Sequence, residues 1–200
     1  RKRICIPDIG EGWMKSFLKI EFMENDNNSI KSIKPVDSNN NTNDFIKEIS
    51  RCMKHRLIPI NLEIIIPRIG THANIILIDT HKKTIELFEP HGNRGHKSEL
   101  ESVSRAYYKV SKNIERFFKK NFSNYKYIPP SAYEPKDGLQ VNLDAYSGLC
   151  VTWSILYLHY RLLNPNTPQK RLVTYLDKKV TRNFILRYMK YIEDILKGKI

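Results

Sequence analysis

Blocks of apolar residues in the middle of this chain predict a set of neighbouring strands. Residues 57–67, LIPINLEIIIP, are almost continuously apolar between prolines, which predicts a strand buried on both faces. Two β-branched runs, 73–79 and 84–89, flank the polar turn 80–83 and predict a β-hairpin. A further short strand is expected at 125–128. The hairpin is the element around which we expect the rest of the chain to be organised.

Two amphipathic stretches show the 3.6-residue period of helices. Asp44 is expected to cap the first helix, over 45–55, and the second helix, over 98–120, carries Lys and Arg opposite its apolar positions. Residues 24–43 are rich in Asn, Ser and Asp, which predicts a flexible insertion. A length of 200 residues is typical of one domain, or of one domain with an arm, so we assign 1–200 to a single domain.

Composition limits the classes of protein that the chain can belong to. With 34 Lys and Arg against 21 Asp and Glu, the formal net charge is +13, which favours polyanions or acidic proteins as partners. No run of about 18 apolar residues occurs and the first ten residues lack an apolar signal core, so we expect neither a membrane span nor a signal peptide. Cys5, Cys52 and Cys150 are too few and too scattered for a disulfide framework, which indicates a reducing intracellular compartment.

The hairpin places an imidazole and a carboxylate at its open end. In an antiparallel hairpin that turns near residue 81, residues whose numbers sum to about 162 lie opposite each other, so His72 falls beside Glu89 or its neighbour. A carboxylate in this place fixes the ring tautomer and stabilises the imidazolium, as a general base requires.

A nucleophile is expected at the start of another helix. The chain is apolar almost all round from Gly148 until Asn164, which predicts a central buried helix with Cys150 in its first turn. The unpaired N–H groups and the positive end of a helix stabilise a thiolate, and a neighbouring imidazolium lowers the thiol pKa further. Cys150 is therefore the candidate nucleophile, while Cys5 and Cys52 are expected to be structural.

The run HANIILIDTHKKTIELFE resembles the His-to-acid hairpin of the Ulp/SENP family of SUMO proteases and of adenain, the adenoviral maturation protease. Those proteases have the order His, acid, Gln, Cys, and their acid follows the His by the interval found here, 89 − 72 = 17. The run IPINLEIIIPRIGTH is similar to the proline-bounded strand that leads to their catalytic His. The likeness covers 57–163 and implies an α+β, papain-like fold of permuted order, in which a helix bearing the nucleophile packs on a central sheet.

The resemblance also implies a role for each candidate residue. Cys150 attacks a carbonyl, His72 moves the proton and Glu89 orients the ring. Gln140 is the side-chain donor of the oxyanion hole, together with the backbone N–H of Cys150. The interval from Gln140 to Cys150, 150 − 140 = 10, is longer than in these families, so the connection has to loop out. Asn142 is the alternative donor.

The residues expected to contact the substrate depart from the family pattern. Ala73 follows His72 where the Ulp/SENP proteases have a Trp that lines a tunnel for a Gly-Gly tail. Gly148 and Trp153 are the other candidates for substrate binding, although the helical spacing of Trp153 favours core packing over the wall of a groove. The implied activity is that of a cysteine protease that cuts peptide or isopeptide bonds near glycine, in ubiquitin-like conjugates or in viral precursor proteins. The composition suits a large DNA virus, which places the protein in the host cytoplasm, the nucleus or the virion.

Two other classes of function stay open. Bacterial effector acetyltransferases that resemble these proteases use the same Cys, His and Glu chemistry, so the chain could be an acyltransferase. Alternatively, its basic surface binds nucleic acid or serves as a scaffold and the triad is vestigial. No cofactor is expected, because Cys52 and His55 have no second pair of metal ligands at suitable spacing. His91 and His96 are expected in a solvated turn.

Overall fold

The structure is a computed structural model that describes residues 4–7, 17–24, 30–35, 42–66, 70–93, 101–144 and 148–199, with side chains placed in 4–7, 45–64, 71–93, 111–143 and 148–199. Six strands in these ranges form one sheet with the order β2-β1-β3-β4-β5-β6. The fold is of the α+β class. Its elements are β1 (Phe17–Glu24), β2 (Ile30–Pro35), α1 (Thr42–Cys52), β3 (Leu57–Ile66), β4 (Gly70–Asp79), β5 (Thr84–Phe88), α2 (Glu101–Asn121), β6 (Lys126–Ile128), η1 (Pro130–Ala132), α3 (Leu139–Asp144), α4 (Cys150–Leu163), α5 (Gln169–Lys179) and α6 (Arg182–Leu196).

The predicted hairpin is formed by β4 and β5, which pair antiparallel at the centre of the sheet. Oδ1 of Asp79 accepts the backbone N–H of His81 at 3.0 Å and that of Lys82 at 3.1 Å, so the Asp side chain closes the turn. Lys83 completes the turn with a φ of 53°. The expected strands at 57–67 and 125–128 are also present, as β3 and β6. They flank the hairpin, β3 antiparallel to β4 and β6 parallel to β5.

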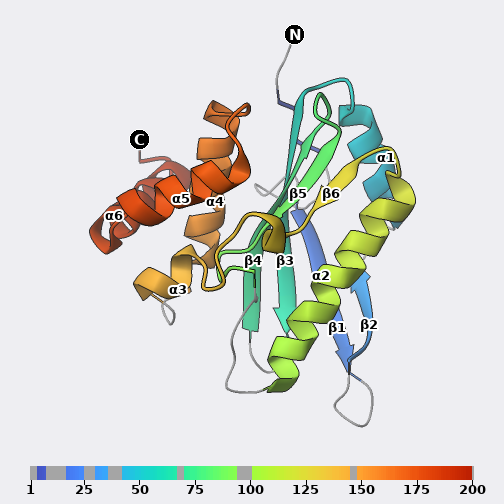
Figure 1. Ribbon diagram of the computed structural model, residues 1–200, viewed down its shortest axis with the longest axis horizontal. Coiled ribbons are helices and arrows are strands. Elements are labelled where there is room, and N and C mark those ends of the chain that lie inside the picture. The colour runs from blue at the N-terminus through green and yellow to red at the C-terminus, as the bar shows by residue number, and fades with distance from the viewer. Residues whose placement is uncertain are drawn as a thin grey trace.

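Helices cover the sheet on both faces (Figure 1). Ile76 and Ile78 of β4 pack in one hydrophobic cluster with residues of α1 and α2. Ile75, which directly precedes Ile76 and so points to the opposite face, packs in a second cluster with residues of α4, α5 and α6. The helix α4, which begins at the candidate nucleophile Cys150, contains Trp153, which is fully buried in this second cluster. The expected packing of that helix on a central sheet is therefore present.

Two predictions about the first quarter of the chain need correction. The first helix begins at Thr42, so Asp44 lies inside α1 and is not its N-cap. The expected flexible insertion over 24–43 contains a strand, because 30–35 form β2 and pair antiparallel with β1. Residues 25–29 and 36–41 of that insertion lie outside the described residues, as does His96.

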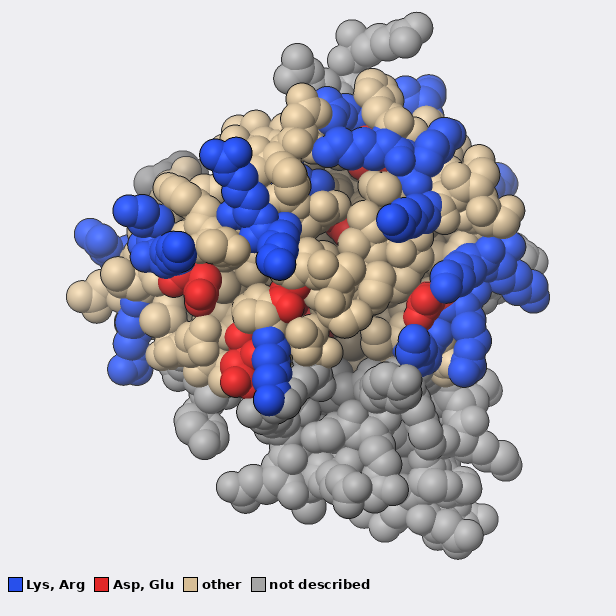
Figure 2. Space-filling model, viewed as in Figure 1, with Lys and Arg blue, Asp and Glu red and all other residues tan. Residues whose placement is uncertain are grey.

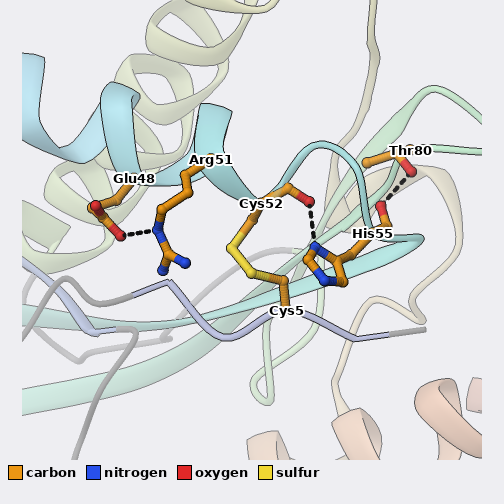
Figure 3. The surroundings of a disulfide bond; sticks show 6 residues. All are labelled: Cys5, Glu48, Arg51, Cys52, His55 and Thr80. Atoms are coloured by element: carbon orange, nitrogen blue, oxygen red, sulfur yellow. Dashed lines mark hydrogen bonds and ion pairs between the residues drawn. A yellow bond between two sulfur atoms is a disulfide. The ribbon is translucent and has the colours of Figure 1, made fainter. Parts of the chain in front are cut away.

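Cys5 and Cys52 form a disulfide bond, which the scattered positions of the cysteines did not predict (Figure 3). Backbone contacts bring the two segments together, because the N–H of Cys5 donates to the carbonyl of Leu57 at 3.0 Å and Ile4 forms a parallel bridge with the same residue. The bond thus fastens 4–7 to the end of α1. Since disulfides persist mainly in oxidising compartments, it weighs against the reducing compartment that the cysteine count indicated, which stays a prediction.

Lys and Arg side chains are spread over the face shown in Figure 2, with few carboxylates between them. They lie over several helices rather than in one continuous groove. Among the described helices, none combines the length and the apolar character needed to span a membrane.

Candidate active site

His72 and Glu89 meet where the hairpin opens. Nε2 of His72 lies 2.6 Å from Oε1 of Glu89, and both side chains are buried. The strand register pairs Ile75 with Phe88, and continuing it places Glu89 opposite Asn74 and His91 opposite His72. The expected contact between His72 and Glu89 is therefore present as a diagonal one. Because Glu89 occupies Nε2, the other ring nitrogen, Nδ1, is left to exchange a proton with a nucleophile.

The Glu89 carboxylate is held by donors on both of its oxygens. Nδ2 of Asn74 donates to Oε2 at 2.6 Å, and the backbone N–H of His91 donates to Oε1 at 2.9 Å. Burial alone raises the pKa of Glu89, but the charge and hydrogen bond of His72, together with the charge and backbone N–H of His91, outweigh it and lower the pKa below its usual value. The carboxylate is thus ionised when it faces His72.

A second carboxyl group, that of Glu134, lies directly behind the first. Its Oε1 accepts the backbone N–H of Glu89 at 2.9 Å, and its side chain is buried. Burial raises the pKa of Glu134 well above its usual range; the hydrogen bond from Glu89 offsets part of this effect, and the charge of Glu89 adds to it. Glu134 is therefore a neutral acid that supports the backbone of the charged one.

Cys150 is the first residue of α4, and its thiol is near enough to His72 for the two side chains to change each other's pKa. Leu149 is the N-cap and has no side-chain acceptor, so the N–H groups of the first turn stay available to a thiolate or an oxyanion. Burial by itself raises the pKa of Cys150, but the hydrogen bond and charge of His72 and the backbone N–H groups of Ala73 and Val151 bring it below the usual value.

The same contacts act on His72 in the opposite direction. Burial alone lowers the pKa of His72, whereas the charge of Glu89 and the hydrogen bonds with Cys150 and Glu89 raise it to about 10. Because this value lies above the lowered pKa of Cys150, the proton rests on the imidazole at neutral pH. This order of the two pKa values favours the thiolate–imidazolium form of the pair, which is the reactive form of a cysteine nucleophile.

A stripe of polar side chains on α4 sets its position against the hairpin. Oγ of Ser154, one turn after Cys150, donates to the carbonyl of Ala73 at 3.2 Å. Further along the same face, Arg161 donates to both oxygens of Glu86, at 2.7 Å from Nε and 3.0 Å from Nη2. Tyr157 OH also reaches Glu86, at 3.2 Å. These contacts fix how far α4 slides along β4 and β5, and so where Cys150 stands relative to the adjoining His72.

Gln140 is attached to the loop that carries the acid. The backbone N–H of Gln140 donates to the carbonyl of Pro90 at 3.0 Å, and that of Gly138 donates to the carbonyl of His91 at 2.9 Å. The segments that contain Gly92 and Gly138 cross so closely that a Cβ added at Gly138 would lie 2.1 Å from the backbone nitrogen of Gly92. No side chain fits at this crossing. Gln140 is therefore positioned by the loop of residues 89–92, which also carries Glu89, despite its interval of ten residues from Cys150.

The structure separates the two candidates for the oxyanion donor. Gln140 is buried, whereas Asn142 is exposed and donates to Oδ1 of Asp177 on α5 at 3.1 Å. Asn142 is thus turned away from the site. The expected looping out of the connection is wrong for its first part, because residues 139–144 form the helix α3, and 145–147 lie outside the described residues.

The three residues expected to bind substrate are placed differently. Ala73 is half-buried next to His72, and Gly148 is exposed two residues before Cys150 with a φ of 70° that favours glycine. Both are open to a substrate that approaches the thiolate. Trp153 is fully buried, so it packs in the core and cannot wall a groove. Val151 is half exposed beside the nucleophile and was not predicted.

Among the described side chains, one cluster has ligand atoms close enough together to hold a metal ion. Ligand atoms of His72, Glu89 and His91 lie within 4.8 Å of one another, and all three side chains are buried. His72 and Glu89 already form a hydrogen bond with each other, so this cluster overlaps the candidate catalytic residues. The weaker Cys52 and His55 pair is excluded, because Cys52 is in the disulfide.

Three residues of the site were missed at the sequence level or assigned elsewhere. Asn74 and His91 each lie two residues from a predicted member of the triad, so the period of two along extended chain could have placed them there. The prediction that His91 lies in a solvated turn is wrong, since it is buried with its ring 4.6 Å from that of His72. Glu134 is distant in sequence from both, and no local signal marks it.

Comparisons with known proteins give one sequence relative and several distant structures. No protein-family model matches the chain. The chain is 28% identical over 187 residues to a curated protein of Acanthamoeba polyphaga mimivirus that is named an ankyrin repeat protein; the match covers 82% of this chain and 23% of that protein. It therefore spans about a quarter of the length of this relative.

Among solved structures, the chain is similar to the Chlamydia trachomatis effector protein ChlaDUB1, with a TM-score of 0.42 and 12% identity, covering 84% of this chain and 64% of that one. It is also similar to the Chlamydia trachomatis effector protein Cdu1, solved bound to ubiquitin, with a TM-score of 0.42 and 12% identity, covering 84% and 73%. At these scores, the chemistry has to be argued from the residues of this chain.

Proposed function

We propose that the chain is a cysteine peptidase that cleaves peptide or isopeptide bonds near glycine, in ubiquitin-like conjugates or viral precursor proteins. The observation that carries the proposal is the buried pair of His72 and Glu89, joined at 2.6 Å, with Cys150 at the start of α4 electrostatically coupled to the His72 ring. An acid, an imidazole and a thiol in this order form a charge-stabilised nucleophile that a structural cluster does not require. The preference for glycine and for ubiquitin-like substrates rests on the resemblance to the Ulp/SENP proteases.

The reaction follows from the placement of the proton. The Cys150 thiolate attacks the carbonyl carbon, and the oxyanion that forms is stabilised by the backbone N–H of Cys150 and by the amide of Gln140. The His72 imidazolium gives its proton to the leaving amine, and the C–N bond breaks to leave a thioester on Cys150. A water molecule, deprotonated by His72, then hydrolyses the thioester and releases the carboxylate product. Glu89 keeps the ring oriented through both steps.

The proposal is tested by locating a covalent adduct. Propargylamide probes made from ubiquitin and from other ubiquitin-like proteins are incubated with the protein, and the modified residue is found by mass spectrometry. An adduct on Cys150 with one probe, absent in Cys150→Ala and slowed strongly in His72→Ala, supports the proposal and names the substrate class. The proposal fails if two results occur together. The protein reacts with no probe, and its Cys150 reacts with iodoacetamide at pH 6 no faster than it does in urea, which shows that the thiol is not activated.

The same experiment separates hydrolysis from acyl transfer, since both use a thioester on Cys150. Acetyl-CoA is added in place of the probe. If Cys150 becomes acetylated and a Gly-Gly reporter is not cleaved, the protein is an acyltransferase and not a peptidase. Cleavage of the reporter would support the proposed peptidase activity.

A further inference from the structure

We propose that Asn74 is a positioning residue of this site, which holds one oxygen of the Glu89 carboxylate so that the other stays on Nε2 of His72. The inference rests on the proposed function and adds to the triad a residue that neither the sequence pattern nor the family resemblance assigned. Asn74 lies on β4, two residues after His72, and is 2% exposed.

Geometry gives Asn74 a specific task. β5 ends at Phe88, so strand pairing does not fix the side chain of Glu89, and the terminal torsion of a Glu is broad and roughly two-fold. A bond to Oε1 alone would let the carboxylate rotate. The bond from Nδ2 of Asn74 to Oε2, at 2.6 Å, prevents this rotation, and a longer bond from the same nitrogen to the Phe88 carbonyl, at 3.3 Å, holds the amide itself.

Stability alone does not explain an amide in this place. Within the described residues, Oδ1 of Asn74 accepts no hydrogen bond, although the atom is buried. A buried acceptor without a partner costs free energy, so a purely structural position would favour an apolar side chain of the same size. The donor half of Asn74 is fully used and its acceptor half is not. This asymmetry is expected of a group retained to donate to a carboxylate.

Charge also favours a neutral donor at this position. The titratable groups that face Glu89 are His72 from β4, His91 after β5, Glu134 from the segment that follows η1, and Cys150 through His72. One imidazolium, one carboxylate and one thiolate must stay ionised together. An amide stabilises the carboxylate without adding a charge, whereas a basic residue in its place would compete with His72 for Glu89.

Asn74→Leu removes the donor at nearly constant volume, and three quantities are measured on it. The first is the pH midpoint at which iodoacetamide labels Cys150, the second is the steady-state kinetics with a reporter substrate, and the third is Tm. A less firmly held Glu89 stabilises the imidazolium less, so the midpoint is expected to rise by about one pH unit. The value of kcat is expected to fall roughly tenfold or more with KM unchanged, as for loss of an interaction made in the transition state.

Thr80→Val is the matched control at the other end of the hairpin. Oγ1 of Thr80 donates to the carbonyl of His55 at 2.6 Å, so the variant loses a buried hydrogen bond without touching the triad. Its Tm should fall while the midpoint and kcat stay at the wild-type values. If Asn74→Leu behaves in the same way, Asn74 is structural and the proposal is overturned.

Two further outcomes are decisive. If Asn74→Leu does not fold, Asn74→Ala is measured in its place, and failure of both to fold overturns the proposal by making Asn74 a structural residue. The pH midpoint of Cys150 labelling in the wild-type protein tests the proposed function separately. If this midpoint equals that of the urea-unfolded chain, Cys150 is not activated and the proposed function fails, whatever the result for Asn74→Leu. A lowered wild-type midpoint with no change in Asn74→Leu refutes the positioning role alone.

Discussion

The side chain of Glu134 accepts the backbone N–H of Glu89 at 2.9 Å, so two buried glutamates stand in contact in opposite states of charge. His72, Asn74 and the N–H of His91 stabilise the charge of Glu89. Burial and the neighbouring charge raise the pKa of Glu134 and keep it neutral. Two neighbouring buried carboxyl groups cannot both ionise cheaply, and the environment decides which one does.

This difference predicts opposite results for the same substitution at the two positions. Glu89→Gln removes the charge that stabilises the imidazolium, and a loss of up to roughly 10⁴ in kcat is expected by analogy with a triad acid. Glu134→Gln replaces a neutral acid by a neutral amide whose oxygen can still accept the Glu89 N–H. Its kcat should stay within a fewfold of wild type.

Steady-state kinetics on both variants check the prediction, with Glu134→Ala as the control that removes the acceptor. A large loss of kcat in Glu134→Gln would show that Glu134 is charged when the enzyme works, and the assignment of protonation states would then be wrong.

The sequence predicted the parts of the site that depend on local pattern. The two β-branched runs and the polar turn at 80–83 define the hairpin, and the hairpin brings His72 close to Glu89. The apolar run after Gly148 places Cys150 at a helix start. These features follow from the periods of strand and helix, which need no knowledge of the tertiary structure.

The sequence could not predict the parts that depend on contacts between distant segments. Glu134 reaches Glu89 from 45 residues away, and Arg161 reaches Glu86 from 75 residues away. No periodicity marks such a pair, because each residue alone resembles an ordinary surface charge. The Cys5–Cys52 bond is hidden for the same reason, since its partners meet only through the pairing of 4–7 with the start of β3.

Gln140 and Asn142 are distinguished by a second prediction. Gln140→Ala should cost about 10²–10³ in kcat, because an oxyanion donor acts mainly on the transition state, while labelling of Cys150 stays intact. Asn142→Ala removes only an exposed hydrogen bond to Asp177 and should change neither quantity. The two variants are compared by kinetics, labelling and Tm. Equal kinetic losses in both would contradict the placement of α3.

A third prediction concerns the crossing of Gly92 and Gly138. A Cβ at Gly138 would meet backbone atoms at 2.1–2.4 Å, which cannot move aside as a flexible side chain can. Gly138→Ala should therefore push the start of α3 away from the acid loop, and lower kcat while Cys150 still reacts with iodoacetamide. Gly198→Ala is the control for a strained glycine substitution away from the site, because its φ is 63° but nothing lies within 4 Å of its added Cβ. Wild-type kcat in Gly138→Ala would show that Gln140 does not depend on the crossing.

The fourth prediction concerns the disulfide. Cys5 and Cys52 are 47 residues apart, and closing a loop of this length stabilises the folded state by roughly 4 kcal/mol on the chain-entropy account. The double variant Cys5→Ser, Cys52→Ser should have a lower Tm, whereas kcat at a temperature where it is folded should be unchanged, because the bond touches no residue of the triad. Denaturation with and without reductant checks the wild-type chain. If reductant leaves its stability unchanged, the bond is not formed in solution.

The last prediction tests the ion pair of Arg161 and Glu86 that fixes α4 against the hairpin. Both side chains are almost fully buried, and Gln169 adds a third donor to Glu86 at 2.7 Å. Removing one partner leaves a buried charge without compensation, so Arg161→Met should destabilise the fold by roughly 3–5 kcal/mol. Replacing both partners removes the charges together. Arg161→Met combined with Glu86→Leu should therefore recover much of that stability, as measured by urea denaturation.

The kinetics of that double variant then separate the effect of the ion pair on the stability of the fold from its effect on the position of α4 along the sheet. If the ion pair also fixes the position of α4 along the sheet, the stable double variant should still have a lower kcat, because Cys150 is carried on the same helix. Ser154 would then be the remaining polar contact between α4 and β4, and adding Ser154→Ala should lower kcat further. Wild-type kcat in the double variant would show that hydrophobic packing around Trp153 is sufficient to hold the nucleophile in place, and that the polar stripe contributes only to stability.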